Sequence, residues 1–144
     1  MNTQLLHSTC VEINGKAALI SGKPGSGKTS LAIQLIDRGA LLVADDQTIV
    51  SLEGKTLIAS PPPALKGFIE VRGVGICPFP YQEKSSLALC VEICEEEDIE
   101  RLPKPLFICY YNIEVRLLKL KKFDPLGAIK VELMVCQENE SYVQ

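Results

Sequence analysis

One glycine-rich segment constrains this chain more than any other part of its sequence. Its residues, Gly22, Lys23, Pro24, Gly25, Ser26, Gly27, Lys28 and Thr29, match the pattern G-x-x-x-x-G-K-[ST] at every required position. The segment lies between the apolar run 17–20 and residues 29–38, which lack glycine and proline. Such a loop between a strand and a helix turns its backbone N–H groups toward phosphates, while the lysine reaches the terminal phosphates and the hydroxyl ligates Mg²⁺. We therefore expect a bound nucleoside triphosphate with Mg²⁺, since a chance glycine-rich turn would rarely combine these residues with this context.

The first half of the chain predicts strands around one helix. Asn14-Gly15, between residues 5–13 and 16–21, is a strong signal for a β-hairpin. Residues 29–38 predict a short helix that ends at Gly39. Residues 41–44 predict a buried strand. A second hairpin is expected from residues 47–52 and 55–59 around Glu53-Gly54.

The second half predicts further strands and one helix. Strands are expected at 68–71, at 87–93 and, with a break near Tyr111-Asn112, within 106–120. Residues 128–136 fit both a helical face and strand alternation, and we assign them to a helix. The sequence therefore predicts a β-rich α/β fold, with residues 1–144 forming a single domain.

Composition excludes several classes of protein. With 47% hydrophobic residues the chain is too apolar to stay disordered, and a net charge of −3 gives no positive field for nucleic acid. No apolar run approaches the roughly 20 residues that span a bilayer, and residues 1–7 lack the pattern of an export signal. We therefore expect a cytoplasmic protein with neither a nucleic-acid nor a membrane partner. Six cysteines in mostly apolar surroundings, without C-x-x-C, predict free thiols and no metal cluster: Cys10, Cys77, Cys90, Cys94, Cys109 and Cys136.

Two neighbouring carboxylates, Asp45 and Asp46, follow the predicted strand 41–44. An acidic residue at such a strand end can hold the metal or its water, and a neighbouring carboxylate can accept a proton from an attacking hydroxyl. The alternative is an exposed turn. Adjacent residues on a strand point to opposite faces, so one of the two aspartates faces the phosphates, and the periodicity does not choose between them.

A segment farther along the chain carries a family resemblance. Ile69-Glu70-Val71-Arg72-Gly73-Val74-Gly75-Ile76 resembles the signature of the HPr kinase/phosphorylase family, in which it likewise follows a phosphate loop and an Asp-Asp strand end. The resemblance runs over about residues 7–133 and matches the catalytic domain alone, as in the short forms of α-proteobacteria. It implies a fold related to phosphoenolpyruvate carboxykinase.

The resemblance also implies an activity and residue roles. The activity is that of an ATP- and Mg²⁺-dependent kinase that phosphorylates a serine of HPr, the phosphocarrier of the sugar phosphotransferase system, and regulates carbon and nitrogen metabolism. By position, Lys28 would contact the transferred phosphate, and Thr29 and Glu70 would bind the metal. Asp46 would accept the seryl proton with support from Asp45, and His7 and Arg101 would complete the catalytic residues.

Three of the carried-over residues also have a plainer interpretation. A lone histidine near the N-terminus is often structural, Arg101 can pair with the acidic residues before it, and Glu70 can pair with Arg72 on one strand face.

The family forms hexamers, but this sequence has no independent interface signal. The basic loop needed for phosphorylase activity is poorly matched by residues 120–127, so that activity has little support. The alternative to a kinase is a non-catalytic ATP-sensing module that binds a signalling partner.

Overall fold

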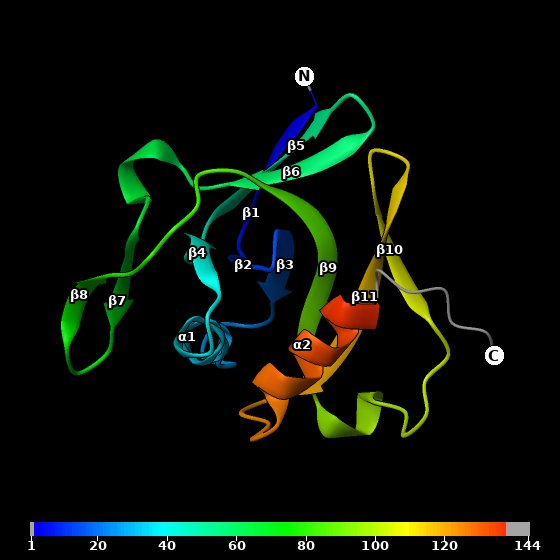
Figure 1. Cartoon of the computed structure of the whole chain (residues 1–144). Helices are drawn as coiled ribbons and strands as arrows, with labels where there is room; N and C mark the ends of the chain where they lie inside the picture. Colours follow the sequence, from blue (N-terminus) through cyan, green and yellow to red (C-terminus); the bar gives the residue numbers. More distant parts are fainter. Residues whose placement is uncertain (1, 138–144) are drawn as a thin grey trace.

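The computed structural model describes residues 2–137 and is dominated by a curled mixed sheet (Figure 1). Nine strands form this sheet, in the order β1-β5-β6-β9-β3-β2-β4, with β11 pairing β9 and β10 pairing β11. The strands are β1 (Thr3–Leu6), β2 (Thr9–Ile13), β3 (Lys16–Ser21), β4 (Leu41–Ala44), β5 (Thr48–Glu53), β6 (Thr56–Ser60), β9 (Ser85–Cys94), β10 (Leu106–Tyr110) and β11 (Ile113–Lys121). A separate hairpin is formed by β7 (Phe68–Val71) and β8 (Gly75–Pro78).

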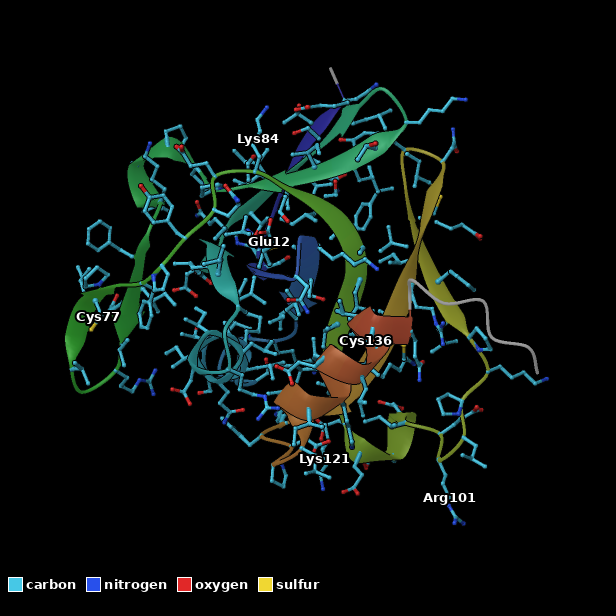
Figure 2. The ribbon with its side chains drawn as sticks, in the orientation of Figure 1. Glu12, Cys77, Lys84, Arg101, Lys121 and Cys136 are labelled. Atoms are coloured by element: carbon cyan, nitrogen blue, oxygen red, sulfur yellow. The ribbon has the colours of Figure 1, made fainter. Side chains whose placement is uncertain are left out.

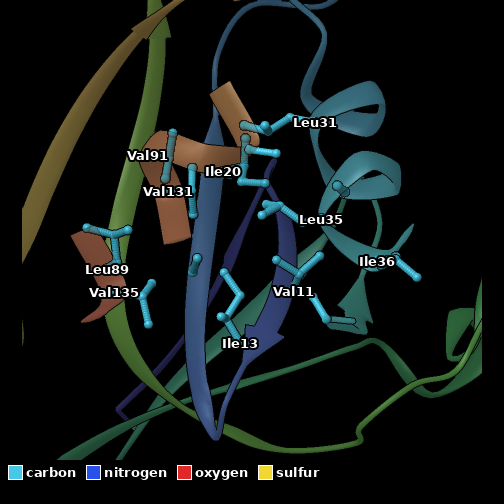
Figure 3. Close-up of a cluster of buried hydrophobic side chains, with 14 of the residues drawn as sticks. Val11, Ile13, Ile20, Leu31, Leu35, Ile36, Leu89, Val91, Val131 and Val135 are labelled. Atoms are coloured by element: carbon cyan, nitrogen blue, oxygen red, sulfur yellow. The ribbon is translucent and has the colours of Figure 1, made fainter. Parts of the chain in front are cut away.

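Two helices cover one face of the sheet: α1 (Lys28–Asp37) and α2 (Gly127–Gln137). Figure 3 shows Leu31 and Leu35 of α1 and Val131 of α2 gathered against Ile20 of β3. The opposite face packs within the curl of the sheet, and Leu19 belongs to that second cluster. Because alternate residues of β3 enter the two clusters, this strand is buried on both faces and holds the segment after it firmly.

Most predicted elements are confirmed. The hairpin around Asn14-Gly15 is formed by β2 and β3, although Leu5 and Leu6 belong to β1, which pairs with β5 instead. The second hairpin has Gly54-Lys55 at its tip, one residue later than predicted. Gly39 follows α1 with a φ of 111°, as a helix-ending glycine requires. The ambiguous segment 128–136 is helical: Ala128, Val131 and Val135, three and four residues apart, pack on the sheet, while Ile129 and Leu133 are exposed.

The strand directions bring the chain's chemical groups to one end of the sheet. Strands β3, β9 and β11 are parallel, and β2 runs antiparallel to both β3 and β4. The carboxyl ends of β3, β4, β9 and β11 therefore meet the amino end of β2. Two 3-10 turns, η1 (Pro63–Leu65) and η2 (Glu96–Asp98), complete the regular structure. Within residues 2–137, no helix is long and apolar enough to cross a membrane.

Candidate active site

The glycine-rich loop joins β3 to α1, as the sequence predicts. Gly25 and Gly27 have φ angles of 79° and 98°, a backbone conformation that glycine adopts without strain. The loop turns on itself, since the N–H of Ser26 donates to the carbonyl of Lys23 at 3.0 Å. Gly27 caps α1 without any side-chain hydrogen bond, and no acidic residue lies in the first turn. The free N–H groups and the helix dipole at this end of α1 therefore favour the binding of an anion.

Two details fit this loop to phosphate oxygens. Nζ of Lys28 donates to the carbonyl of Gly22 at 2.9 Å, so the ammonium group lies across the loop. The buried hydroxyl of Ser26 has no hydrogen-bond partner within residues 2–137. A buried hydroxyl without a partner is unfavourable, so an acceptor brought to it by a rearrangement of the loop would stabilise the site.

Asp45 is the aspartate that faces the loop. Its Oδ1 accepts hydrogen bonds from the hydroxyl of Thr29 at 3.0 Å and from that of Thr9 at 3.2 Å. The backbone N–H of Asp46 donates to the same Thr9 hydroxyl at 3.1 Å. Asp46 has a φ of 65°, and its exposed side chain makes no hydrogen bond or ion pair in the described chain. The turn after β4 thus directs one carboxylate to Thr29 and leaves the other accessible.

The environment of Asp45 raises the pKa of its carboxyl. Burial raises the pKa of this carboxyl, and the charge of Asp46 adds to the effect. Hydrogen bonds from Thr29 and Thr9 and the charge of Lys28 oppose burial, yet the pKa stays above its ordinary value. A cation beside Asp45 would therefore stabilise the ionised form.

Thr29 and Asp45 have the chemistry of a magnesium site. Their oxygens lie 3.0 Å apart. Neighbouring ligands around octahedral Mg²⁺ with bonds of 2.0–2.1 Å are separated by about 2.9 Å. Within residues 2–137, no group of three or more His, Cys, Asp and Glu side chains could hold a metal by itself. Mg²⁺ suits such a site, because it keeps several waters and takes its other ligands from phosphates.

The expected catalytic histidine lies at the same end of the sheet. His7 is an exposed residue in the bend between β1 and β2, two positions before Thr9. Because Cys10 of β2 is paired with Ala44 of β4, the bend adjoins the turn that carries Asp45 and Asp46. The side chain of His7 makes no hydrogen bond or ion pair with the described residues, so only the backbone brings it to this site.

Glu70 and Arg101 are not brought into these contacts. Ile69 of β7 is buried in the cluster that holds α1, whereas Glu70, on the opposite face of the strand, is exposed. Arg101 follows η2 and points away from the ribbon in Figure 2. Neither side chain makes a hydrogen bond or ion pair with another residue of the 2–137 segment. The free cysteines expected from the sequence are found, with Cys10 and Cys90 buried.

Two residues of this site were missed by the sequence analysis. Thr9 reaches Asp45 only through the pairing of β2 with β4, for which no local sequence signal exists. Phe123, in the segment between β11 and α2, lies against the loop: a Cβ on Gly27 would be 2.9 Å from its ring. A lone aromatic residue after two lysines gives no hint of that contact.

The strand, loop and helix, with a carboxylate at the end of a neighbouring strand, define a P-loop phosphate-binding protein. Residues 1–104 match the family model described as HPr Serine kinase C-terminal domain. The chain belongs to this family, as the signature at residues 69–76 predicts.

Individual relatives agree with this assignment. An HPr kinase/phosphorylase of Chlorobium phaeobacteroides is 36% identical over 110 residues, which are 69% of this chain and 32% of the relative. One from Clostridium tetani is 47% identical over 76 residues, which are 52% of this chain and 25% of the relative. The chain thus spans about a third or less of the length of these relatives.

A solved structure matches nearly the whole fold. It is that of the HPr(Ser) kinase/phosphatase from Coxiella burnetii, with a TM-score of 0.80 and 26% identity. The match covers 93% of this chain and 89% of that one. The β-rich α/β fold predicted from the strand and helix patterns is therefore confirmed.

Proposed function

We propose that this chain is an ATP- and Mg²⁺-dependent kinase that phosphorylates a serine of HPr. The observation that carries the proposal is the hydrogen bond between Thr29, at the end of the phosphate loop, and Asp45, with Asp46 accessible beside it. A phosphate loop alone would suit any nucleotide-binding protein. A second carboxylate that is free to take a proton suits transfer to a hydroxyl. The names of the relatives supply the acceptor, HPr.

The residues divide the reaction between them. The loop N–H groups and Lys28 would hold the β- and γ-phosphates, and Thr29 with Asp45 would hold Mg²⁺, whose charge would stabilise the phosphate oxygens. Asp46 accepts the proton of the seryl hydroxyl. The seryl oxygen bonds to the γ-phosphorus, and the bond between the γ-phosphorus and the oxygen that leaves with ADP breaks. Glu70 as a metal ligand, and His7 and Arg101 as catalytic residues, rest on the family resemblance alone and stay predictions.

The proposal extends to the setting of the enzyme. We place it in the cytoplasm, with no nucleic-acid or membrane partner, because a net charge of −3 and the absence of long apolar runs favour neither. Assembly into a homo-oligomer, a hexamer in the family, follows from the resemblance only. Light scattering of the purified protein tests it.

The experiment is intact-mass analysis of HPr from the same organism after incubation with this protein, ATP and Mg²⁺. We expect a mass gain of one phosphate on a serine. Asp46→Asn should abolish it while ATP still binds, and Asp37→Asn, at an exposed aspartate that ends α1, should not affect it. A chase with inorganic phosphate tests the reverse reaction. Absence of any mass gain despite ATP binding would reject the kinase in favour of an ATP-sensing module.

A further inference from the structure

The positions of Asp45 and Asp46 relative to the phosphate loop indicate on which side of β3 the nucleoside of a bound nucleotide lies. Asp45 and Asp46 extend from β4, and Thr9 begins β2, so these groups lie on one side of β3 in the sheet order. Strands β9 and β11 lie on the other side. If the γ-phosphate meets Asp45 and Asp46, as the proposed function requires, the nucleoside extends away from them. It therefore reaches the segment between β11 and α2.

Phe123 lies at that place. Three carbons at one edge of its ring would be 2.9–3.5 Å from a Cβ on Gly27, so the ring rests on the bare backbone of the phosphate loop. The residue is nevertheless 67% exposed. Exposing an aromatic side chain of this size loses the stabilisation that burial provides. Its ring is thus held at the loop but is not covered by the protein.

The backbone around Phe123 is held in a costly conformation. Its φ of 50° lies in the left-handed region, which a bulky residue rarely adopts. The next residue, Asp124, fixes the segment: its carboxylate accepts from the N–H of Leu126 at 2.9 Å and from Nζ of Lys130 at 2.6 Å. Strain of this kind persists where the surroundings impose it, and it is concentrated at ligand-binding positions.

The surroundings of Phe123 leave room for a flat ring against its exposed side. A hollow of about 80 Å³ beside Phe123 is lined by Ser30 and Gln34 of α1 and by Pro125. A purine can lie over the exposed ring, with Ser30 and Gln34 at its edge.

We propose that Phe123 is the platform on which the base of the bound purine nucleoside triphosphate stacks. This inference rests on the proposed nucleotide site. It adds the part of the site that binds the base to the part that binds the phosphates. Base–aromatic stacking of this kind changes affinity by about 5- to 150-fold and depends little on the identity of the base. Phe123 therefore acts in nucleotide affinity and not in holding the phosphates.

Calorimetric titration with Mg·ATP and, separately, with magnesium tripolyphosphate tests the proposal, because only ATP has a base. We expect Phe123→Ala to weaken ATP binding by about 5- to 150-fold and to leave tripolyphosphate binding unchanged. The matched control is Phe107→Ala, at a 53% exposed phenylalanine of β10. It should alter neither affinity.

A second variant gives an independent signal. The chain has no tryptophan, so Phe123→Trp introduces its only indole. Its fluorescence should be quenched by ATP and unaffected by tripolyphosphate. Equal weakening of both ligands by Phe123→Ala would mean that the ring only packs the phosphate loop, and unchanged ATP affinity would likewise overturn the proposal. A wild-type protein that binds neither ligand would reject the nucleotide site itself. ATP binding that depends on Phe123 without transfer to HPr would reject the kinase alone.

Discussion

The hydroxyl of Thr29 donates a 3.0 Å hydrogen bond to Oδ1 of Asp45, joining the phosphate loop to the end of β4. This bond separates the roles of two adjacent carboxylates. Asp45 is turned toward the loop and partly buried, while Asp46 is exposed in a left-handed turn. In the proposed reaction the first carboxylate holds the metal and the second takes the proton.

Replacing each aspartate should therefore have a different effect. We expect Asp45→Asn to reduce the gain in ATP affinity that Mg²⁺ provides by about tenfold or more, because one charged ligand oxygen is lost. Asp46→Asn should keep that gain and lose turnover by about a hundredfold or more. Calorimetry with and without Mg²⁺ and the HPr assay measure the two effects. Equal loss of Mg²⁺ dependence in both variants would contradict the assignment of metal binding to Asp45 and proton acceptance to Asp46. The control variant is Asp37→Asn.

Thr9 should act as a positioning residue. Its hydroxyl donates to Asp45 and accepts from the N–H of Asp46, so Thr9→Val removes both contacts at nearly constant volume. We expect kcat to fall by about tenfold with little change in KM for ATP, as for other groups that orient metal ligands. Thr9→Ser should restore kcat, which a purely structural role would not require.

The control for Thr9 is Thr56→Val, at an exposed threonine of β6. A loss of activity in Thr9→Val that Thr9→Ser does not recover, together with a lower free energy of unfolding, would show that Thr9 only supports the fold.

The elements that the sequence predicts well are those with local signals. The phosphate loop, α1 and β4 each follow from residue types within ten positions. The two hairpin turns follow from Asn14-Gly15 and Glu53-Gly54, where a glycine marks the turn. The strand ending at Leu6 was missed as a separate element because its partner, β5, is remote in sequence.

The choice between Asp45 and Asp46 could not be made from strand alternation. Alternation ends with the strand, and the left-handed φ of Asp46 with the Thr9 contact determines which carboxylate turns inward. Phe123 was missed for a similar reason, since its contact with Gly27 arises from the parallel pairing of β11 with β9 and of β9 with β3. Long-range pairing leaves no periodic pattern in one sequence.

The raised pKa of Asp45 predicts a pH dependence of folding. A carboxyl whose folded-state pKa exceeds its unfolded value contributes stability at low pH, and this contribution is lost as pH rises through the folded pKa. Without Mg²⁺, the difference in free energy of unfolding between wild type and Asp45→Asn should therefore shift in favour of the variant as pH rises above about 4.

Urea unfolding in the presence of a chelator, between pH 3 and 7, measures this difference for Asp45→Asn and for the control Asp37→Asn. A difference that is constant across the range would contradict the raised pKa. Added Mg²⁺ should reverse the trend, because the metal binds the ionised form and its affinity falls as Asp45 is protonated.

Asp124 should give stability a pH dependence opposite in sign to that of Asp45. Its burial alone would raise the pKa, but the hydrogen bonds from Lys130 and from the N–H of Leu126 outweigh burial and hold the pKa below its ordinary value. Such a group contributes stability above its unfolded pKa, and that stability is lost as pH falls through the folded pKa. Asp124→Asn keeps an oxygen for the Leu126 N–H but loses the ionic contact. It should therefore cost about 1 kcal/mol at pH 7 and progressively less as the pH falls through the lowered pKa of Asp124.

Asp124→Ala removes both contacts and should cost more at every pH, since the N–H of Leu126 then loses the acceptor that leads the chain into α2. Urea unfolding of the three proteins at pH 7 and pH 3 separates the two contributions. If Asp124→Asn remained equally destabilised at pH 3, the ionic contact would not be the cause. The same variants test the anchoring of Phe123, because a loosened segment should weaken ATP binding in Asp124→Ala while tripolyphosphate binding stays unchanged.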